Sequence, residues 1–344
     1  MAEGTVDVEA PAHKVARPVP AVPEIEVRLP DNQCERLIRL AEGLAAVRTA
    51  VVHPVDPETL TALVEATKAG IIAPVLVGPE ARIRRAAQSA GVDITPFEIV
   101  ATEHSHAAAA TSARLAGDRR VGALMKGSLH TDEFMEAIVA EPRLRTARRM
   151  SHVFVVEVSR YPRPLFLTDA AVNIAPTLEE KRDIVLNAID LAHVLGVREP
   201  RVAILSAIET VSERLRSTLD AAALCKMADR RQITGGIVDG PLAFDNAVSE
   251  DAAKAKEIVS RVAGRADILV VPDLESGNML VKQLEYLGGA QLAGIVMGAR
   301  VPIVLTSRAD KARSRLASCA AARLLSHAWA TVGPSAGAAE RDHA

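Results

Sequence analysis

The sequence predicts an α/β protein in which parallel strands are covered by helices on both faces. Short apolar runs rich in Val, Ile and Leu alternate with helical segments along most of the chain. The chain has 344 residues, 49% of them hydrophobic, which is enough to fill two domains or one large domain. The number of predicted strands favours two wound sheets over one. Only 2% of the residues are aromatic, so Ala, Val, Leu and Ile must supply the packing.

The first set of elements alternates strand and helix regularly. The strands share a β-branched, apolar composition and are predicted at residues 49–52, 73–77, 97–101 and 121–125. The clearest helix start is Asp56, a capping residue followed by Pro57, and Gly70 ends this helix. Further helices are predicted at 79–90, at 104–115 and from 131 onward. This alternation predicts a parallel sheet.

A second set of elements begins with the run 153–158. This run alternates apolar and polar residues more than the others do, which predicts an edge or antiparallel strand. Thr177 and Glu180 have the spacing of a capping box, and the helix that they begin should end at Gly196. The remaining strands are predicted at 165–167, 201–205, 236–238, 266–271, 293–296 and 303–305.

Both ends of the chain are predicted to be flexible. Residues 1–30 carry several prolines among Ala and Val, a composition that favours an extended tether. Residues 333–344 are small and polar, which predicts a disordered tail.

Charge and cysteine usage exclude several classes of partner. The chain has 41 Lys and Arg against 43 Asp and Glu, and no long basic block, so we expect neither nucleic acid nor an anionic membrane as the main partner. Cys34, Cys225 and Cys319 are far apart and form no C-x-x-C pair, which predicts no disulfide framework and no zinc knuckle. The N-terminus lacks the apolar core of a signal peptide, and no apolar run reaches membrane-spanning length. We therefore expect a cytoplasmic protein.

The segment 302–310 carries the most specific chemistry. The strand 303–305 leads directly into helical sequence from Ala309, so Thr306, Ser307 and Arg308 fall at the turn. Free backbone N–H groups, two hydroxyl groups and one guanidinium would converge there, which predicts an anion site for phosphate or carboxylate. The alternative is that Ser307 only caps the helix while Arg308 is solvated.

Polar residues also follow the other predicted strands. They are grouped as Lys126-Gly127-Ser128, Asp169 with Asn173, Asp239-Gly240, Asp273 with Ser276-Gly277-Asn278, and Thr306-Ser307-Arg308. Each group alone could serve a turn or a helix cap. Because ligands gather at the carboxyl ends of strands in wound sheets, five groups at equivalent positions favour one shared cleft. His104 and His106 are interpreted as surface or capping residues, and Gly294 and Gly298 as turn glycines.

Five of the runs carry a family resemblance in their order and spacing. They are 125–132, 166–173, 238–245, 271–278 and 302–308, and they resemble the phosphate acetyl/butyryltransferase family over roughly residues 50–325. The pair formed by the third and fourth runs is the most specific to this family. Met125-Lys-Gly and the run Ser-Arg-Ala-Asp310 lean towards its butyryl-type branch.

The resemblance implies a fold and a reaction. The fold is like that of isocitrate and isopropylmalate dehydrogenases: two α/β domains, each a three-layer sandwich, with an interdomain cleft, usually in a homodimer. The first domain would be discontinuous, residues 31–150 plus 297–332, and the second would span 151–296. The reaction is reversible transfer of an acetyl group, or a short acyl group such as butyryl, between coenzyme A and inorganic phosphate. These small molecules are substrates, and no cofactor or metal is implied.

The resemblance also implies roles for individual residues. In the family the serine equivalent to Ser307 stabilises the reacting carbonyl or thiolate, and the arginine equivalent to Arg308 holds the phosphoryl group. Acetyl-type members carry an aspartate base where this chain has Ser314, so the base role is given to Asp310, and Ala170 replaces a cysteine found in many relatives. The residues expected to bind substrate are Lys126, Gly127, Asp169, Asn173, Asp273, Ser276, Gly277 and Asn278.

Two alternatives remain open from the sequence. One is a metal-dependent oxidoreductase on the same kind of scaffold, although the chain has no recognisable cofactor loop. The other is an acyl-CoA-holding or docking module without full activity, because the proline-rich start resembles the linker of a fusion to an enoyl-CoA hydratase. The sequence does not fix the acyl chain length.

Overall fold

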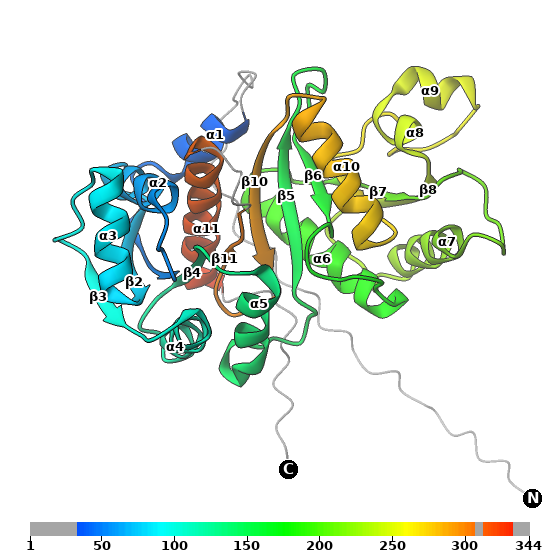
Figure 1. The fold of residues 1–344 in the computed structure, drawn as a ribbon. Helices are drawn as coiled ribbons and strands as arrows, with labels where there is room; N and C mark the ends of the chain where they lie inside the picture. Colours follow the sequence, from blue (N-terminus) through cyan, green and yellow to red (C-terminus); the bar gives the residue numbers. More distant parts are fainter. Residues whose placement is uncertain (1–32, 307–311, 333–344) are drawn as a thin grey trace, which may run out of the picture.

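A computed structural model describes residues 33–306 and 312–332 of the chain (Figure 1). The predictions for residues 1–30 and 333–344 lie outside the described residues. The first half of the described chain contains α1 (Gln33–Ala41), β1 (Val47–Val52), α2 (Pro57–Lys68), β2 (Ile72–Gly78), α3 (Glu80–Ala90), β3 (Glu98–Ala101), α4 (Ser105–Gly117), β4 (Ala123–Lys126), α5 (Thr131–Ala140) and the short 3₁₀ helix η1 (Pro142–Leu144).

The rest of the described chain contains the remaining strands, β5 to β11, and the helices between and after them. In order these are β5 (Ser151–Glu157), β6 (Leu165–Thr168), α6 (Leu178–Val194), β7 (Arg201–Leu205), α7 (Arg216–Asp229), β8 (Ile237–Leu242), α8 (Phe244–Val248), α9 (Glu250–Ala255), β9 (Ile268–Val270), α10 (Leu274–Tyr286), β10 (Gln291–Met297), β11 (Ile303–Val304) and α11 (Ala312–Val332). Every predicted strand is present, and boundaries differ by a few residues.

The local signals act as the sequence predicts. Asp56 caps α2 by accepting a hydrogen bond from the Thr59 backbone N–H at 2.7 Å. Thr177 and Glu180 form the reciprocal capping box of α6. His104 caps α4, as expected, by accepting from the Ala107 N–H through Nδ1. These short-range bonds fix where the helices begin, because they satisfy backbone donors that have no partner inside the helix.

The prediction of two wound sheets is wrong, because the strands form one mixed sheet. Its eleven strands run in the order β3-β2-β1-β4-β11-β10-β5-β6-β9-β7-β8. The antiparallel ladders β10–β5 and β5–β6 join the two halves. The run predicted as an edge or antiparallel strand is β5, which is antiparallel but lies in the middle of the sheet. Strand composition alone does not show that a hydrogen-bonded ladder continues between two halves.

Strand direction changes across the middle of the sheet. Strands β1, β2, β3, β4 and β11 run parallel to one another, and so do β6, β9, β7 and β8. Three antiparallel pairings separate the two groups, at β11–β10, β10–β5 and β5–β6, so the groups point in opposite directions. The five polar groups are therefore not all at equivalent ends of the sheet.

The hydrophobic core is continuous on one face of the sheet and divided on the other. One cluster runs beneath α1, α2, α3, α6, α7 and α11. On the opposite face, one cluster lies under α4 and α5 and another under α8, α9 and α10, as the positions of α5 and α10 in Figure 1 illustrate. The C-terminal elements return to the first half, since β11 pairs with β4 and α11 contacts α1 and α2. The exact domain boundaries stay a prediction.

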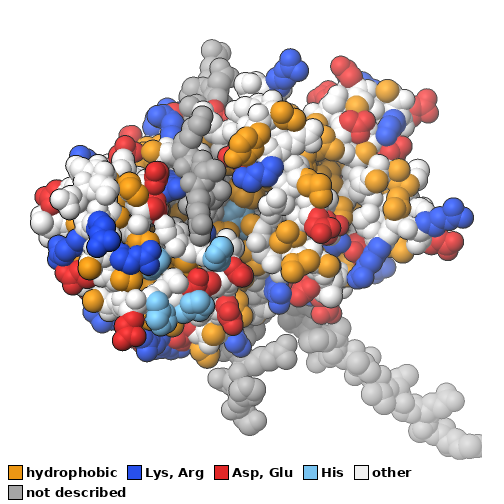
Figure 2. Space-filling view, in the orientation of Figure 1, with side chains coloured by type: hydrophobic (Ala, Val, Ile, Leu, Met, Phe, Trp, Pro, Cys, Tyr) orange, Lys and Arg blue, Asp and Glu red, His pale blue; other side chains and the backbone are white. Residues whose placement is uncertain are grey.

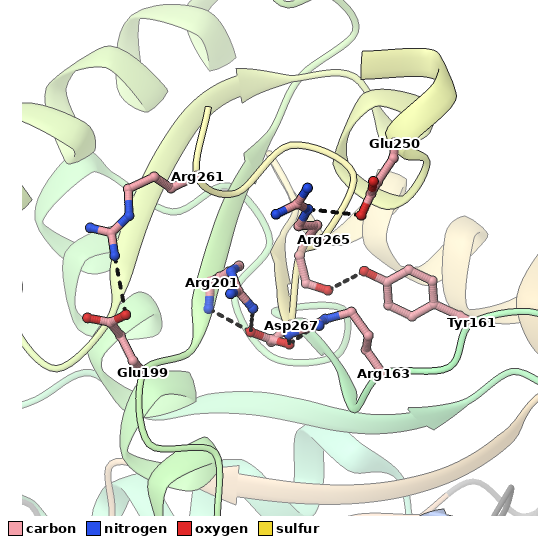
Figure 3. Close-up of polar contacts among 9 residues, drawn as sticks. Tyr161, Arg163, Glu199, Arg201, Glu250, Arg261, Arg265 and Asp267 are labelled. Carbon is pink, nitrogen blue, oxygen red and sulfur yellow. Dashed lines mark hydrogen bonds and ion pairs between the residues drawn. The ribbon is translucent and has the colours of Figure 1, made fainter. Parts of the chain in front are cut away.

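An ionic cluster fixes the amino ends of the strands in the second half. Asp267, which is 1% exposed, accepts hydrogen bonds from Arg163 Nη2 at 2.8 Å and from the Arg201 backbone N–H at 2.9 Å. Figure 3 shows both arginines pointing at this carboxylate, with Tyr161 donating to the carbonyl of Ala266 beside it. Buried carboxylates of this kind are stable only when their lone pairs are satisfied. The cluster ties the β5–β6 connection to β7 and β9.

Candidate active site

The end of β11 lies near the centre of the sheet, between β4 and β10. Leu305 and Thr306 continue from it and are 5% and 7% exposed. Ser307, Arg308 and Asp310, the residues predicted to be catalytic, lie outside the described residues, and α11 begins at Ala312. The predicted anion site therefore stays a prediction. The structure does place the two residues that precede it, Leu305 and Thr306, in a buried position.

A buried histidine contacts this strand end. His152 on β5 is 0% exposed, and its Nε2 lies 3.2 Å from the carbonyl oxygen of Leu305. Its ring packs edge-on against Phe154 with 4.2 Å between the ring centroids. Burial lowers the pKa of His152 to about 4, so the ring is neutral near pH 7. Sequence reasoning missed His152, although a histidine next to an apolar strand was the available signal.

Gly294 leaves the space that this histidine occupies. It lies within β10 rather than in a turn, which corrects the prediction, whereas Gly298 does have the positive φ of a turn glycine. A Cβ atom on Gly294 would lie 2.6 Å from the Leu305 carbonyl oxygen and 2.8 Å from His152 Nε2. The close approach of three strands at this point thus requires glycine.

The loop after β4 is tied to the end of β1. Lys126 is buried, and its Nζ donates to the carbonyl of Leu129 at 3.0 Å. A Cβ on Gly127 would lie 2.5 Å from the carbonyl oxygen of Val52, so only glycine fits there. Both predicted residues therefore shape this loop, and their binding of substrate stays a prediction.

Ser128 and His53 make further hydrogen bonds between the loop after β4 and the segment after β1. Ser128 donates its hydroxyl to the carboxylate of Asp56, and His53 Nδ1 donates to the Ser128 carbonyl at 2.9 Å. Burial raises the pKa of Asp56, but hydrogen bonds from Ser128 and Thr59 outweigh it and bring the pKa below its usual value. His53 has φ 54°, a left-handed conformation uncommon for a histidine. No sequence pattern had singled it out.

The loop after β6 is organised by Asp169. Its Oδ1 accepts from the backbone N–H groups of Ala171 at 3.0 Å and Val172 at 3.1 Å. Its Oδ2 accepts from the backbone N–H of Asn173 at 3.1 Å and from the Asn173 side-chain amide at 2.5 Å. Burial raises the pKa of Asp169, although these hydrogen bonds act in the opposite direction. The two residues were predicted to bind substrate, and here they shape the loop.

The start of α10 packs against the same loop. Asp273 caps the helix, because its Oδ1 accepts from the backbone N–H and the hydroxyl of Ser276, each at 2.8 Å. A Cβ on Gly277 would lie 2.9 Å from the Cβ of Ala170, and Asn278 Nδ2 donates to the Ala170 carbonyl at 3.4 Å. The structure thus brings the predicted residues after β6 and after β9 together.

The loops after β4 and after β6 contact the clusters on the face where the core divides. Ala171 and Val172 pack against the hydrophobic cluster that contains Leu129 and Leu305. The loop after β6 therefore reaches the first half of the protein. The strand register places Thr168 level with Val304, so this loop lies toward the start of β11. On the face drawn in Figure 2, basic and acidic side chains are interspersed over both halves.

One predicted group lies elsewhere. Asp239 and Gly240 are in β8, the strand at the end of the sheet, with β7 between them and β9. Asp239 accepts a hydrogen bond from the Ser260 hydroxyl, which in turn accepts from the Val262 N–H at 2.9 Å. These contacts give Asp239 the turn-holding role that was its alternative reading. The expectation that five groups share one cleft is therefore wrong for this group.

Within residues 33–306 and 312–332, no group of three or more His, Cys, Asp or Glu side chains could hold a metal ion. In the same ranges no helix is long and apolar enough to cross a bilayer.

Comparisons with known proteins agree with the resemblance seen in the motifs. The model of the phosphate acetyl/butaryl transferase family matches residues 108–322. A phosphate acetyltransferase from Rickettsia felis is 57% identical over 291 residues, covering 84% of this chain and 83% of that protein. A phosphate butyryltransferase from Clostridium acetobutylicum is 42% identical over 279 residues, covering 81% and 93%.

A solved structure extends the agreement to three dimensions. The branched-chain phosphotransacylase from Enterococcus faecalis superposes with a TM-score of 0.70 at 29% identity, covering 81% of this chain and 99% of that one. Together with the family match and the sequence relatives, this establishes that the chain belongs to the phosphate acetyl/butaryl transferase family.

Proposed function

We propose that this protein transfers an acyl group reversibly between coenzyme A and inorganic phosphate. The observation that carries the proposal is its family membership, with 57% identity to a protein named phosphate acetyltransferase. Acyl-CoA and phosphate would bind together in a ternary complex. Phosphate oxygen attacks the thioester carbonyl, the C–S bond breaks, and the products are acyl phosphate and free coenzyme A. No metal, further cofactor or covalent enzyme intermediate takes part.

The proposed roles follow the charge that develops in the reaction. Arg308 would hold phosphate through two parallel N–H donors, and Ser307 would stabilise the negative carbonyl oxygen or the leaving thiolate. In the reverse direction the coenzyme A thiol, with a pKa of about 8.5 like that of cysteine, gains from a general base, which we assign to Asp310. The buried end of β11 supports these roles, because it fixes the backbone two residues before Ser307.

The acyl group is proposed to be acetyl. The relative named acetyltransferase is 57% identical, whereas the relative named butyryltransferase is 42% identical. This difference outweighs the short motifs that lean towards the butyryl-type branch. A series from acetyl-CoA to hexanoyl-CoA should give its highest kcat/KM with acetyl-CoA, and a maximum at butyryl-CoA would overturn the assignment.

The test of the reaction is thiol release. Purified protein with acetyl-CoA and phosphate should release free coenzyme A and form acetyl phosphate. Arsenate in place of phosphate should drive release to completion, because acyl arsenates hydrolyse. Binding of acetyl-CoA without phosphate-dependent release would favour the acyl-CoA-holding module instead.

Arg308→Lys tests the proposed phosphate site. Lysine keeps the positive charge but loses the two-pronged geometry, so we expect kcat/KM to fall by about a hundredfold or more. The matched control is Arg300→Lys, an exposed arginine before β11, which should stay within about twofold of wild type. Thiol-release rates near wild type for Arg308→Lys would remove Arg308 from the mechanism.

We also propose that the protein is a cytoplasmic homodimer with a cleft between two dehydrogenase-like domains. Support for the dimer comes from large apolar side chains exposed on and near α10: Ile174 at 72%, Met279 at 67%, Tyr286 at 67% and Leu287 at 83%. Figure 2 shows hydrophobic side chains at the surface over this half. Free Cys34, Cys225 and Cys319 fit a reducing compartment. Light scattering should give twice the mass of one chain, and a monomer mass would contradict the dimer.

A further inference from the structure

His152 is bonded to the ends of β11 and β6, the two strands that precede predicted site residues. Its side-chain Nε2 lies 3.2 Å from the carbonyl oxygen of Leu305, two residues before Ser307 in the chain. Its own backbone carbonyl accepts from the Thr168 hydroxyl at 2.8 Å, immediately before Asp169. One residue in the middle of the sheet is thus bonded to the end of β11 and to the end of β6.

The chemistry of this contact fixes the state of the ring. Because Leu305 offers a carbonyl, Nε2 must carry the proton, and the neutral ring then has a bare lone pair on Nδ1. Nδ1 is buried and has no hydrogen-bond partner among the described residues. An unsatisfied buried acceptor costs free energy, so an apolar side chain would pack here at less cost. The favourable contribution of His152 is therefore the bond to Leu305.

Two neighbours leave the ring little freedom. Gly294 lies so close that any Cβ there would collide with both Nε2 and the Leu305 carbonyl oxygen, at 2.8 and 2.6 Å. Phe154 packs edge-on against the ring, 4.2 Å away between centroids. With the ring held in this way, Nε2 can point in one direction only, toward the Leu305 carbonyl. The bond can therefore fix the position of the end of β11.

We propose that His152 is a positioning residue of the acyl transfer, which holds the Leu305 carbonyl and so sets the end of β11 relative to the loop 168–173. The proposal rests on the proposed function. It assigns His152 no contact with substrate. Losing the side-chain bond leaves the fold and the Thr168 bond to the His152 backbone in place but frees the end of β11, so the loss should appear in kcat rather than in acyl-CoA affinity.

The test compares variants that differ in the donor. His152→Met has similar bulk and no donor, whereas His152→Gln carries an amide N–H at nearly the same reach as Nε2. We expect His152→Met to lower kcat at least about tenfold while KM for acetyl-CoA stays within about twofold. His152→Gln should recover most of kcat. Gly294→Ala should reproduce the His152→Met loss, because it displaces the same bond from the other side.

The control removes a histidine-to-carbonyl bond of the same kind at a more exposed place. His193 Nε2 contacts the Gly235 carbonyl at 2.7 Å, at the end of α6, so His193→Met makes the same chemical change far from the strand end. It should leave kcat within about twofold. His152→Met with wild-type kcat, or His152→Gln as impaired as His152→Met, would overturn the proposal.

Hydrogen exchange gives a readout that does not depend on activity. Backbone amides in the peptide covering Leu305 should exchange faster in His152→Met than in wild type, and at the wild-type rate in His193→Met. The peptide covering Thr168 is the internal control, because its bond to the His152 backbone carbonyl is kept. If wild type shows no phosphate-dependent thiol release while exchange rises as expected, the proposed function fails, and the hold of His152 on the end of β11 stands without a role in acyl transfer. Unchanged exchange in the Leu305 peptide overturns the positioning role, whatever the activity.

Discussion

At the scale of single residues, the buried histidine on β5 makes stability depend on pH. Burial lowers the pKa of His152 to about 4, against 6.5 for an unperturbed histidine. Above pH 6.5 the ring is neutral in both folded and unfolded states and has no effect. Between pH 6.5 and 4 the unfolded chain binds a proton that the folded protein does not, so the folded state loses stability. Below pH 4 both states are protonated and the loss is complete.

This effect can be isolated by comparing wild type with His152→Gln. Each pH unit within the window corresponds to about 1.4 kcal/mol, so lowering the pH from 7 to 5 should cost wild type about 2 kcal/mol more than the variant. Urea unfolding at the two pH values measures the difference. Asp169, whose pKa is raised by burial, acts in the opposite direction but equally in both proteins. Parallel pH profiles would contradict the prediction.

Residue types near the site could be predicted from the sequence, but their partners could not. Asp169 and Asn173 were expected to bind substrate. In the structure the Asp169 carboxylate accepts four hydrogen bonds, three from backbone N–H groups of the loop and one from the Asn173 side-chain amide. A carboxylate after a strand accepts from whichever donors are nearest, and that depends on the loop conformation. His152 was missed because its role arises from Leu305, which is distant in sequence.

At the scale of elements, α10 and the loop after β6 form one unit through close contact. Gly277 was expected to bind substrate, and the structure shows why glycine is needed: a Cβ would lie 2.6 Å from Val271 Cγ2 and 2.9 Å from Ala170 Cβ. Gly277→Ala should therefore lower the free energy of unfolding by about 1–3 kcal/mol. Gly117→Ala is the control, since the atoms nearest to its Cβ would belong to the long side chains of Arg143 and Glu141, at 3.0 Å or more. Equal stability of the two variants in urea would refute the packing account.

The cap of α10 can be separated from a direct role in binding. Asp273→Ala removes the acceptor for Ser276, so we expect about 1 kcal/mol less stability and a higher KM for acetyl-CoA as the helix start moves. Asp273→Asn can still cap, and should recover both quantities. Recovery of stability without recovery of KM would show that the carboxylate charge itself contacts substrate.

Helix limits were predictable because caps are local. Asp56, Thr177 and His104 each accept a hydrogen bond from a backbone N–H three residues later. A cap and its partner therefore fall within one short stretch of sequence, where a pattern can identify them. Strand partners are not local. The short strand β11 pairs with β4 and β10, and the sequence had placed its residues in the sheet without indicating which strands would flank them.

At the scale of the whole molecule, the resemblance indicated two domains, and strand counting indicated two sheets. The second expectation failed because strand number says nothing about the ladders at β10 and β5 that connect the halves. The helices on one face reinforce this connection, since a single hydrophobic cluster extends from α1 through α11 to α6 and α7. The loops after β4 and β6, which carry described residues of the candidate site, contact the clusters on the other face, where the core is divided.

A continuous sheet with a continuous core on one face predicts that the protein unfolds in one cooperative transition. The single tryptophan, Trp329 on α11, packs against that cluster and reports on the first half. Its fluorescence and the far-UV circular dichroism of all helices should give the same urea midpoint at a fixed protein concentration. A Trp329→Phe, Phe244→Trp double variant moves the reporter to α8 in the second half, and its midpoints should also coincide. The contradicting outcome has two parts: the two proteins differ in fluorescence midpoint, and the circular dichroism of each falls in two steps. The halves would then unfold separately, and the ladder between β5 and β10 would not couple them.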